Sequence, residues 1–132
     1  MSMFVGATTA QFDAALFEKM TAIARAALQG KNGNNTQAIV LHTEKGADYC
    51  SVIQDALSAD RTDENELLNQ LIANGDTRVQ YILCMWQNRE VDLPSYAFRK
   101  LLLETDAENF DAEIFVCTEN SYAAVKLGRT MK

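Results

Sequence analysis

The sequence predicts a three-layer α/β fold, in which helices cover both faces of a mixed five-stranded sheet. Strand-like apolar segments alternate with helix-periodic segments in the order α-β-β-α-β-α-β-β. No repeat, low-complexity tract or linker interrupts the 132 residues. Strands that alternate with helices after an initial hairpin form sheets of this kind. We therefore expect one domain that spans residues 1–132.

The first two elements are a helix and a β-hairpin. A capping box at Thr8 and Gln11 predicts the helix start, and the helix is expected to end near Gly30. Its buried face should carry the apolar residues that recur at helical spacing, Leu16, Met20, Ile23 and Ala27. The runs TQAIVLHTE and ADYCSVIQ, joined at Glu44-Lys45-Gly46, then predict a hairpin over residues 36–53.

A second helix is predicted within DRTDENELLNQLIANG, with its end at Asn74-Gly75. Its apolar face comprises Leu67, Leu68, Leu71 and Ile72. Its first turn holds three acids, which suit the helix dipole: Asp63, Glu64 and Glu66.

The remaining segments complete the order. RVQYILCMW reads as a strand covered on both faces, LPSYAFRKLLLE as a third helix, and AEIFVCT and YAAVKL as two further strands. The acidic segment ETDAENFD reads as a solvated loop.

Charge and composition exclude several classes of function. The net charge of −6 argues against nucleic-acid binding, which depends on Lys and Arg. The start MSMFVGATTA does not resemble a signal peptide, and no apolar run is long enough to span a bilayer, so we expect no membrane partner and a cytoplasmic location. Three cysteines in apolar contexts predict buried free thiols: Cys50, Cys84 and Cys117.

Two motifs at helix starts carry a family resemblance. The T-x-E of residues 62–64 and the P-S-x-x-F of residues 94–98 are similar to motifs of the zinc-dependent cytidine deaminase superfamily, as is YCSVIQDALSADRTDE over residues 49–64. In that family a Cys or His two residues before a Glu, together with P-C-x-x-C, supplies three zinc ligands and a general acid/base. Of the chemical residues, this chain retains Glu64.

The departures from the family pattern are at the ligand positions. Thr62, Ser95 and Phe98 stand where the resemblance requires three zinc ligands. Hydroxyls are poor zinc ligands and a benzyl group cannot coordinate, so zinc, the family's cofactor, is predicted to be absent. The ribose-binding positions fall on Ser51 and Ile53. The remodelled cleft is expected to include these two residues together with Cys50, Trp86 and Pro94.

No replacement metal site is evident, because the chain has one histidine, His42, and no C-x-x-C. Glu64 has two interpretations, a surviving general acid/base or a first-turn acid that stabilises its helix, and we favour the second. Thr62 and Ser95 are expected to hydrogen-bond to each other or to Glu64.

These observations predict a catalytically inactive protein of the cytidine deaminase type. Its expected activities are self-association as a dimer or tetramer, which the resemblance implies, and binding of a small molecule or protein in the cleft. The alternative is an active cytidine or nucleoside deaminase-type hydrolase that uses Glu64 with an unconventional metal site.

Overall fold

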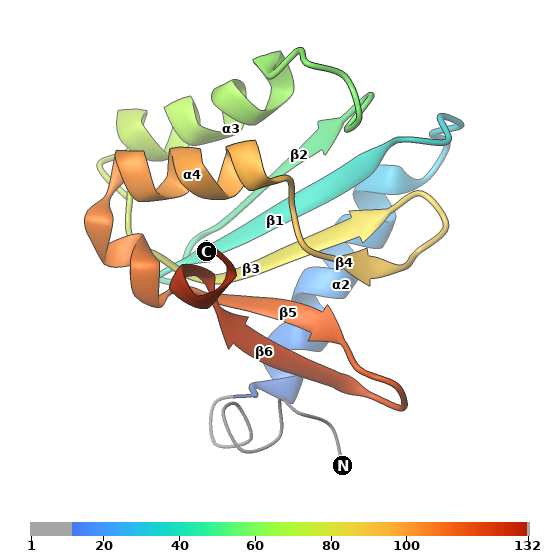
Figure 1. Cartoon of the computed structure of the whole chain (residues 1–132). Helices are drawn as coiled ribbons and strands as arrows, with labels where there is room; N and C mark the ends of the chain where they lie inside the picture. The colour runs from blue at the N-terminus through green and yellow to red at the C-terminus, as the bar shows by residue number, and fades with distance from the viewer. Residues whose placement is uncertain (1–11, 132) are drawn as a thin grey trace.

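The computed structural model describes residues 12–131 and has the predicted layers (Figure 1). Within these residues the α-helices are α2 (Ala14–Leu28), α3 (Thr62–Ala73) and α4 (Tyr96–Thr105). The strands are β1 (Gln37–Thr43), β2 (Asp48–Ile53), β3 (Val79–Trp86), β4 (Val91–Asp92), β5 (Glu113–Cys117) and β6 (Tyr122–Lys126). Two 3₁₀ helices, η1 (Ala107–Asp111) and η2 (Leu127–Thr130), complete the described chain.

The sheet is mixed, as predicted. Five strands follow the order β2-β1-β3-β5-β6, in which β3 and β5 are parallel and the other pairs are antiparallel. A sixth strand, β4, pairs with β3 in antiparallel fashion. The sequence did not predict β4 because two residues are too few to show an alternating pattern.

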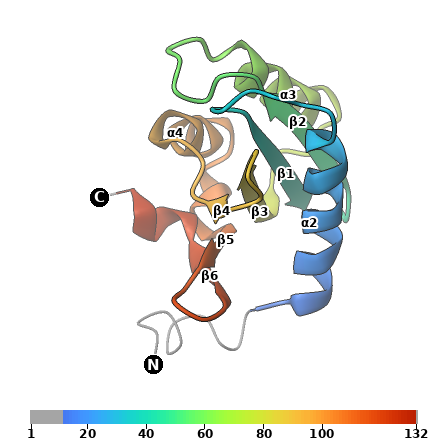
Figure 2. The same cartoon turned by 90° about the vertical axis from the view of Figure 1, so that its right-hand side faces the viewer.

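Helices cover both faces of the sheet. The helix α2 lies on one face, and α3 and α4 lie side by side on the other (Figures 1 and 2). A hydrophobic core lies on each face of the sheet, and successive residues of β1 point alternately into the two cores. Ile39 and Leu41 pack with the α3–α4 layer, whereas Ala38 and Val40 pack with the α2 layer. This burial on both faces explains why β1 reads as a continuous apolar run.

The start of α2 is capped by Asp13, whose Oδ1 accepts a hydrogen bond from the Leu16 amide over 3.0 Å. The predicted capping box at Thr8 and Gln11 lies outside the described residues. The fully buried apolar residues of α2 are Met20, Ala24 and Leu28, whereas Leu16, Ile23 and Ala27 are half-buried. The core-facing stripe is therefore centred about one residue away from the predicted one.

The hairpin and the end of α3 match the prediction. Gly46 in the hairpin turn has φ +87° and Gly75 after α3 has φ +61°, a backbone region that suits glycine. One part of the predicted α3 face is wrong, because Ile72 is 55% exposed. The three leucines of that face, Leu67, Leu68 and Leu71, are buried.

The segment predicted as a solvated loop contains a buried anchor, so that expectation is wrong. Asn109 in η1 is 0% exposed. Its Oδ1 accepts from the Val79 amide over 2.8 Å, and its Nδ2 donates to the carbonyls of Thr77 and Leu102 over 3.0 and 2.9 Å. The acidic neighbours conceal this role in the sequence, because composition cannot show which side chain of a polar run turns inward.

The cysteines differ in burial. All three are free thiols, as predicted, but only Cys84 is buried; Cys50 is half-buried and Cys117 is exposed. Cys117 ends β5, where the strand leaves the core. Among residues 12–131, no helix is long and apolar enough to cross a membrane.

Candidate functional site

The N-terminal ends of α3 and α4 meet at a hydrogen bond between Glu64 and Ser95. Ser95 caps α4, and its Oγ accepts from the Phe98 amide over 3.0 Å. The same hydroxyl donates to Glu64 Oε2 over 3.2 Å. Pro94, which is buried, precedes the cap and restricts the backbone at the helix entry. The sequence-predicted contact between Ser95 and Glu64 is thus confirmed.

The Glu64 side chain is 1% exposed, and both of its oxygens are engaged. Arg61 Nη1 donates to Glu64 Oε1 over 3.3 Å, and Ser95 binds the other oxygen. A buried carboxylate requires such partners, because an unpaired charge in the interior is strongly destabilising. Sequence reasoning missed Arg61, although its position three residues before Glu64 is a spacing at which helical side chains interact.

Cys84 of β3 lies within the electrostatic reach of this carboxylate. Burial raises the pKa of the Cys84 thiol, and the negative charges of Asp92 and Glu64 raise it further. Both effects disfavour the thiolate of Cys84, which is the form of a cysteine that acts as nucleophile and metal ligand.

Phe98 occupies the interior one turn after Ser95. Its side chain is 0% exposed and belongs to the core between the sheet and the α3–α4 layer. At this position the family resemblance calls for a metal ligand. A buried benzyl ring fills that space with apolar carbon.

Thr62 points away from the other two positions. It is exposed, and both its amide and its Oγ1 donate to Asp60 Oδ1, over 2.9 and 2.6 Å. The expected bond between Thr62 and Ser95 or Glu64 is therefore wrong. The reason is local: the Asp60 carboxylate, two residues earlier, offers an acceptor next to the exposed helix start.

The residues of β2 divide between the two faces of the sheet, as successive side chains of a strand do. Ser51 Oγ lies 3.5 Å from the Asp63 carbonyl of α3, and Ile53 is buried in the core on that side. Cys50 packs against the α2 layer instead. The structure does not bring Cys50 to Glu64.

The donor set does not suit zinc. In residues 12–131, no group of three or more His, Cys, Asp and Glu side chains is arranged to hold a metal ion. At the family's ligand positions the side chains are an exposed hydroxyl bonded to Asp60, a hydroxyl bonded to Glu64 and a buried ring. His42 binds Asp48 on the α2 side, with Nδ1 and Oδ1 2.8 Å apart, and Lys19 binds the same carboxylate at 2.7 Å.

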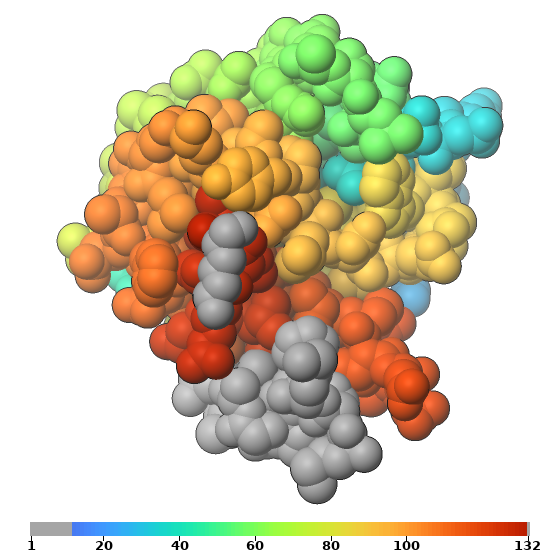
Figure 3. All heavy atoms as spheres, in the orientation of Figure 1, coloured from blue at the N-terminus to red at the C-terminus, as the bar shows by residue number. Residues whose placement is uncertain are grey.

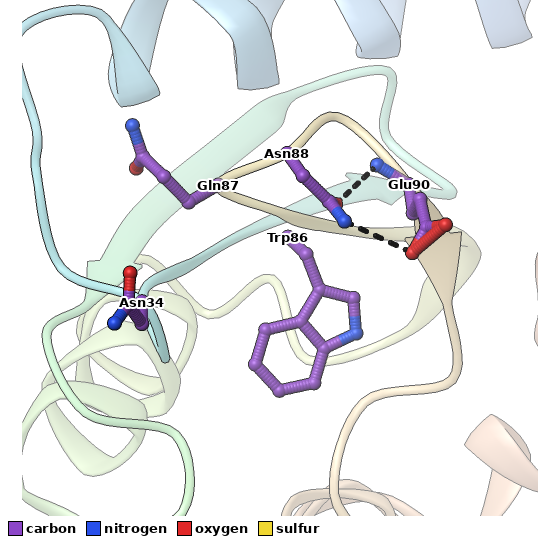
Figure 4. Close-up of a pocket in the computed structure, with 5 residues that line it drawn as sticks. All are labelled: Asn34, Trp86, Gln87, Asn88 and Glu90. Atoms are coloured by element: carbon purple, nitrogen blue, oxygen red, sulfur yellow. Dashed lines mark hydrogen bonds between the residues drawn. The ribbon is translucent and has the colours of Figure 1, made fainter.

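A surface pocket of about 390 Å³ lies where β3 ends (Figure 4). Its lining comprises Asn34, Trp86, Gln87, Asn88 and Glu90. The indole of Trp86 donates to Asp92 Oδ2 over 2.9 Å, which fixes the orientation of the ring. The sequence singled out Trp86 but not its polar neighbours, because a hydrophilic run after a strand is typical of any hairpin turn.

The arrangement of elements is shared with solved enzymes. The chain aligns with cytidine deaminase from Mycobacterium leprae with a TM-score of 0.65 and 15% identity, over 87% of this chain and 96% of that one. The enzyme from Bacillus anthracis gives 0.64 and 14%, over 87% and 86%. The fold is that of the cytidine deaminases.

The Mycobacterium tuberculosis cytidine deaminase gives a TM-score of 0.61 and 16% identity, over 86% of this chain and 92% of that one. No protein-family model matches the chain, and no curated protein matches its sequence. The chain therefore shares its fold with these enzymes, although the pairwise sequence identity is low. What the site can do must be judged from the side chains of this chain.

Proposed function

We propose that this chain is a non-catalytic protein with the cytidine deaminase fold. The observation that carries the proposal is the environment of Glu64, whose carboxylate is 1% exposed and is bound by Arg61 and Ser95. A general acid/base must come within hydrogen-bonding distance of the group whose proton it transfers. A buried, paired carboxylate instead holds α3 against α4.

The proposal includes the loss of the zinc centre. It is supported by Phe98 in the core and by the hydroxyl groups of Thr62 and Ser95, which have other hydrogen-bond partners. Metal analysis of protein purified without chelators is expected to find zinc well below one equivalent per chain. A stoichiometric zinc content that survives dialysis would contradict this part of the proposal.

The competing proposal is an active cytidine or nucleoside deaminase-type hydrolase that depends on Glu64. Ammonia release from cytidine, deoxycytidine, adenosine and guanosine, measured with added zinc, separates the two. We expect no difference between the parent chain and the Glu64→Gln variant, with an active cytidine deaminase as the assay control. Turnover that disappears in a folded Glu64→Gln variant would overturn the non-catalytic proposal.

A binding role remains compatible with the site, and we place it at the Trp86 pocket. This pocket offers an aromatic side chain and several amides, and amides and aromatic rings commonly fix the orientation of a small ligand. Trp86 is the one tryptophan of the sequence, so tryptophan fluorescence comes from a side chain that lines this pocket. A panel of nucleosides and bases should include one that changes Trp86 emission and raises the melting temperature.

Self-association is the other proposed activity. It is supported by apolar side chains exposed on the α3–α4 side of the molecule, with Ile72 and Tyr96 each 55% exposed. Sedimentation velocity is expected to give a dimer or tetramer, and Tyr96→Glu or Ile72→Glu should shift it toward the monomer. A parent chain that is monomeric at high concentration would contradict self-association without affecting the other proposals.

A further inference from the structure

The sequence contains two Asn-Gly pairs in different structural settings. Asn32-Gly33 lies in the connection between α2 and β1, and Asn74-Gly75 follows α3. Both pairs are exposed to solvent. Glycine lacks the Cβ that would hinder approach to its amide nitrogen, so sequence alone makes the two asparagines equally reactive toward that nitrogen.

The Asn74-Gly75 pair is held on both sides of its peptide bond. Asn74 Nδ2 donates to the Gln70 carbonyl over 2.8 Å, and the Gly75 amide donates to the Ile72 carbonyl over 3.1 Å. Lys45 Nζ in turn donates to the Gly75 carbonyl over 2.8 Å. The nucleophilic nitrogen and the electrophilic side chain are therefore both restrained by the helix end.

The Asn32-Gly33 pair has much less support. Within residues 12–131, no hydrogen bond holds the Asn32 side chain or the Gly33 amide; the Gly33 carbonyl accepts from the Thr36 amide over 3.3 Å. The position also requires glycine, because a Cβ at residue 33 would lie 2.3 Å from Thr36 Oγ1. That hydroxyl donates to the Gln54 carbonyl over 3.0 Å, and both residues of the pair are exposed.

We propose that Asn32 is a site of spontaneous deamidation and that Asn74 is protected by the fold. The Gly33 amide loses its proton to solvent base, and its nitrogen attacks Asn32 Cγ. The new C–N bond closes a succinimide ring, the bond from Cγ to Nδ2 breaks, and ammonia leaves. Water then opens the ring at either carbonyl and yields aspartate or isoaspartate at residue 32.

The modification changes the chain near the Trp86 pocket. It adds one carboxylate, so the formal net charge changes from −6 to −7 (−6 − 1). Isoaspartate also inserts one methylene into the backbone, two residues before Asn34, which lines the pocket. Asn35 and Thr36 then lead directly into β1, where the backbone is fixed by the sheet.

Tryptic mapping distinguishes the two sites, because cleavage places Asn32 in peptide 32–45 and Asn74 in peptide 62–78. The full chain is incubated at mildly alkaline pH in two parallel samples, one folded and one in concentrated urea. Samples taken before incubation correct for deamidation that occurs during digestion. In the folded chain we expect Asn32 to deamidate at least roughly tenfold faster than Asn74, consistent with protection by a few hydrogen bonds. In urea the two rates should converge.

Equal rates for Asn32 and Asn74 in the folded chain would overturn the proposal. An intact Asn32 in the folded chain, when both sites react in urea, would overturn it as well. The Asn32→Gln variant is the matched control, because the longer glutamine side chain cannot close the five-membered succinimide ring. This substitution should abolish the charge change in peptide 32–45. Persistence of that change in Asn32→Gln would assign the reaction to Asn34 or Asn35 and would also contradict the proposal.

Discussion

The Ser95 hydroxyl joins two helices, since it donates to Glu64 Oε2 over 3.2 Å and accepts from the Phe98 amide over 3.0 Å. It therefore caps α4 and satisfies a buried carboxylate of α3 at the same time. The two roles rest on one oxygen atom. Removing that atom affects the helix start and the charge together.

We predict that Ser95→Ala destabilises the protein by about 2 kcal/mol, because it removes an N-cap and a hydrogen bond to a buried charge. Thr62→Ala is the matched control, since Thr62 is exposed and its hydroxyl donates to the neighbouring Asp60; it should cost less than about 0.5 kcal/mol. Urea denaturation of both variants measures the difference. Equal effects would show that the Ser95–Glu64 bond adds little to stability.

Phe98→Ala should be among the most damaging substitutions in the chain. The ring is 0% exposed, and its loss is expected to cost about 3–5 kcal/mol through lost burial and the cavity left behind. Phe110, which is 53% exposed, provides the control, and Phe110→Ala should cost about 1 kcal/mol or less. A small effect at Phe98, measured by thermal or urea unfolding, would mean that the metal position is not filled by this ring.

Asn109→Ala tests the buried anchor in η1. The substitution removes the partners of the Val79 amide and of the Thr77 and Leu102 carbonyls, so it should cost about 3 kcal/mol. Asn69→Ala on the exposed side of α3 is the control and should be neutral or slightly stabilising, because alanine favours helices. Similar stabilities of the two variants would contradict the anchor role.

Acid sensitivity is expected from Asp48. Burial raises its pKa, but the hydrogen bonds and positive charges of Lys19 and His42 outweigh burial, and the pKa lies below its ordinary value of 3.8. A carboxylate whose pKa is lowered by folding stabilises the protein above the unfolded-state pKa and loses this contribution as pH falls through the folded-state pKa. Stability should therefore fall below about pH 4.

The Asp48→Asn variant isolates this contribution. At pH 7 the variant should be less stable than the parent chain by about 1 kcal/mol. The expected effect is small because the Lys19 side chain is exposed and water weakens its attraction to Asp48. The difference between the two proteins should shrink as the pH falls below about 4. Glu119→Gln, on the exposed β5–β6 turn, controls for the loss of one negative charge. A constant difference across the acid range would rule out Asp48 titration as its cause.

Patterns that repeat along the chain predicted most of the fold. The helices α3 and α4 and five of the strands were expected from periodicity, and Gly46 and Gly75 marked turns that their backbone angles confirm. The errors at Ile72, Asn109 and Cys117 share one cause. Burial of a single side chain near the end of an element or in a short polar segment depends on which neighbour covers it, and that neighbour is distant in sequence.

The candidate site divides in the same way. The sequence by itself determined which side chains stand at Thr62, Ser95 and Phe98, and hence that no thiolate or imidazole is present there. Only the tertiary structure decided that Ser95 bonds to Glu64, that Thr62 turns to Asp60 and that Arg61 pairs with the buried Glu64. Residue identity fixes the chemistry that is possible, whereas the packing of α3 against α4 fixes which groups come within hydrogen-bonding distance.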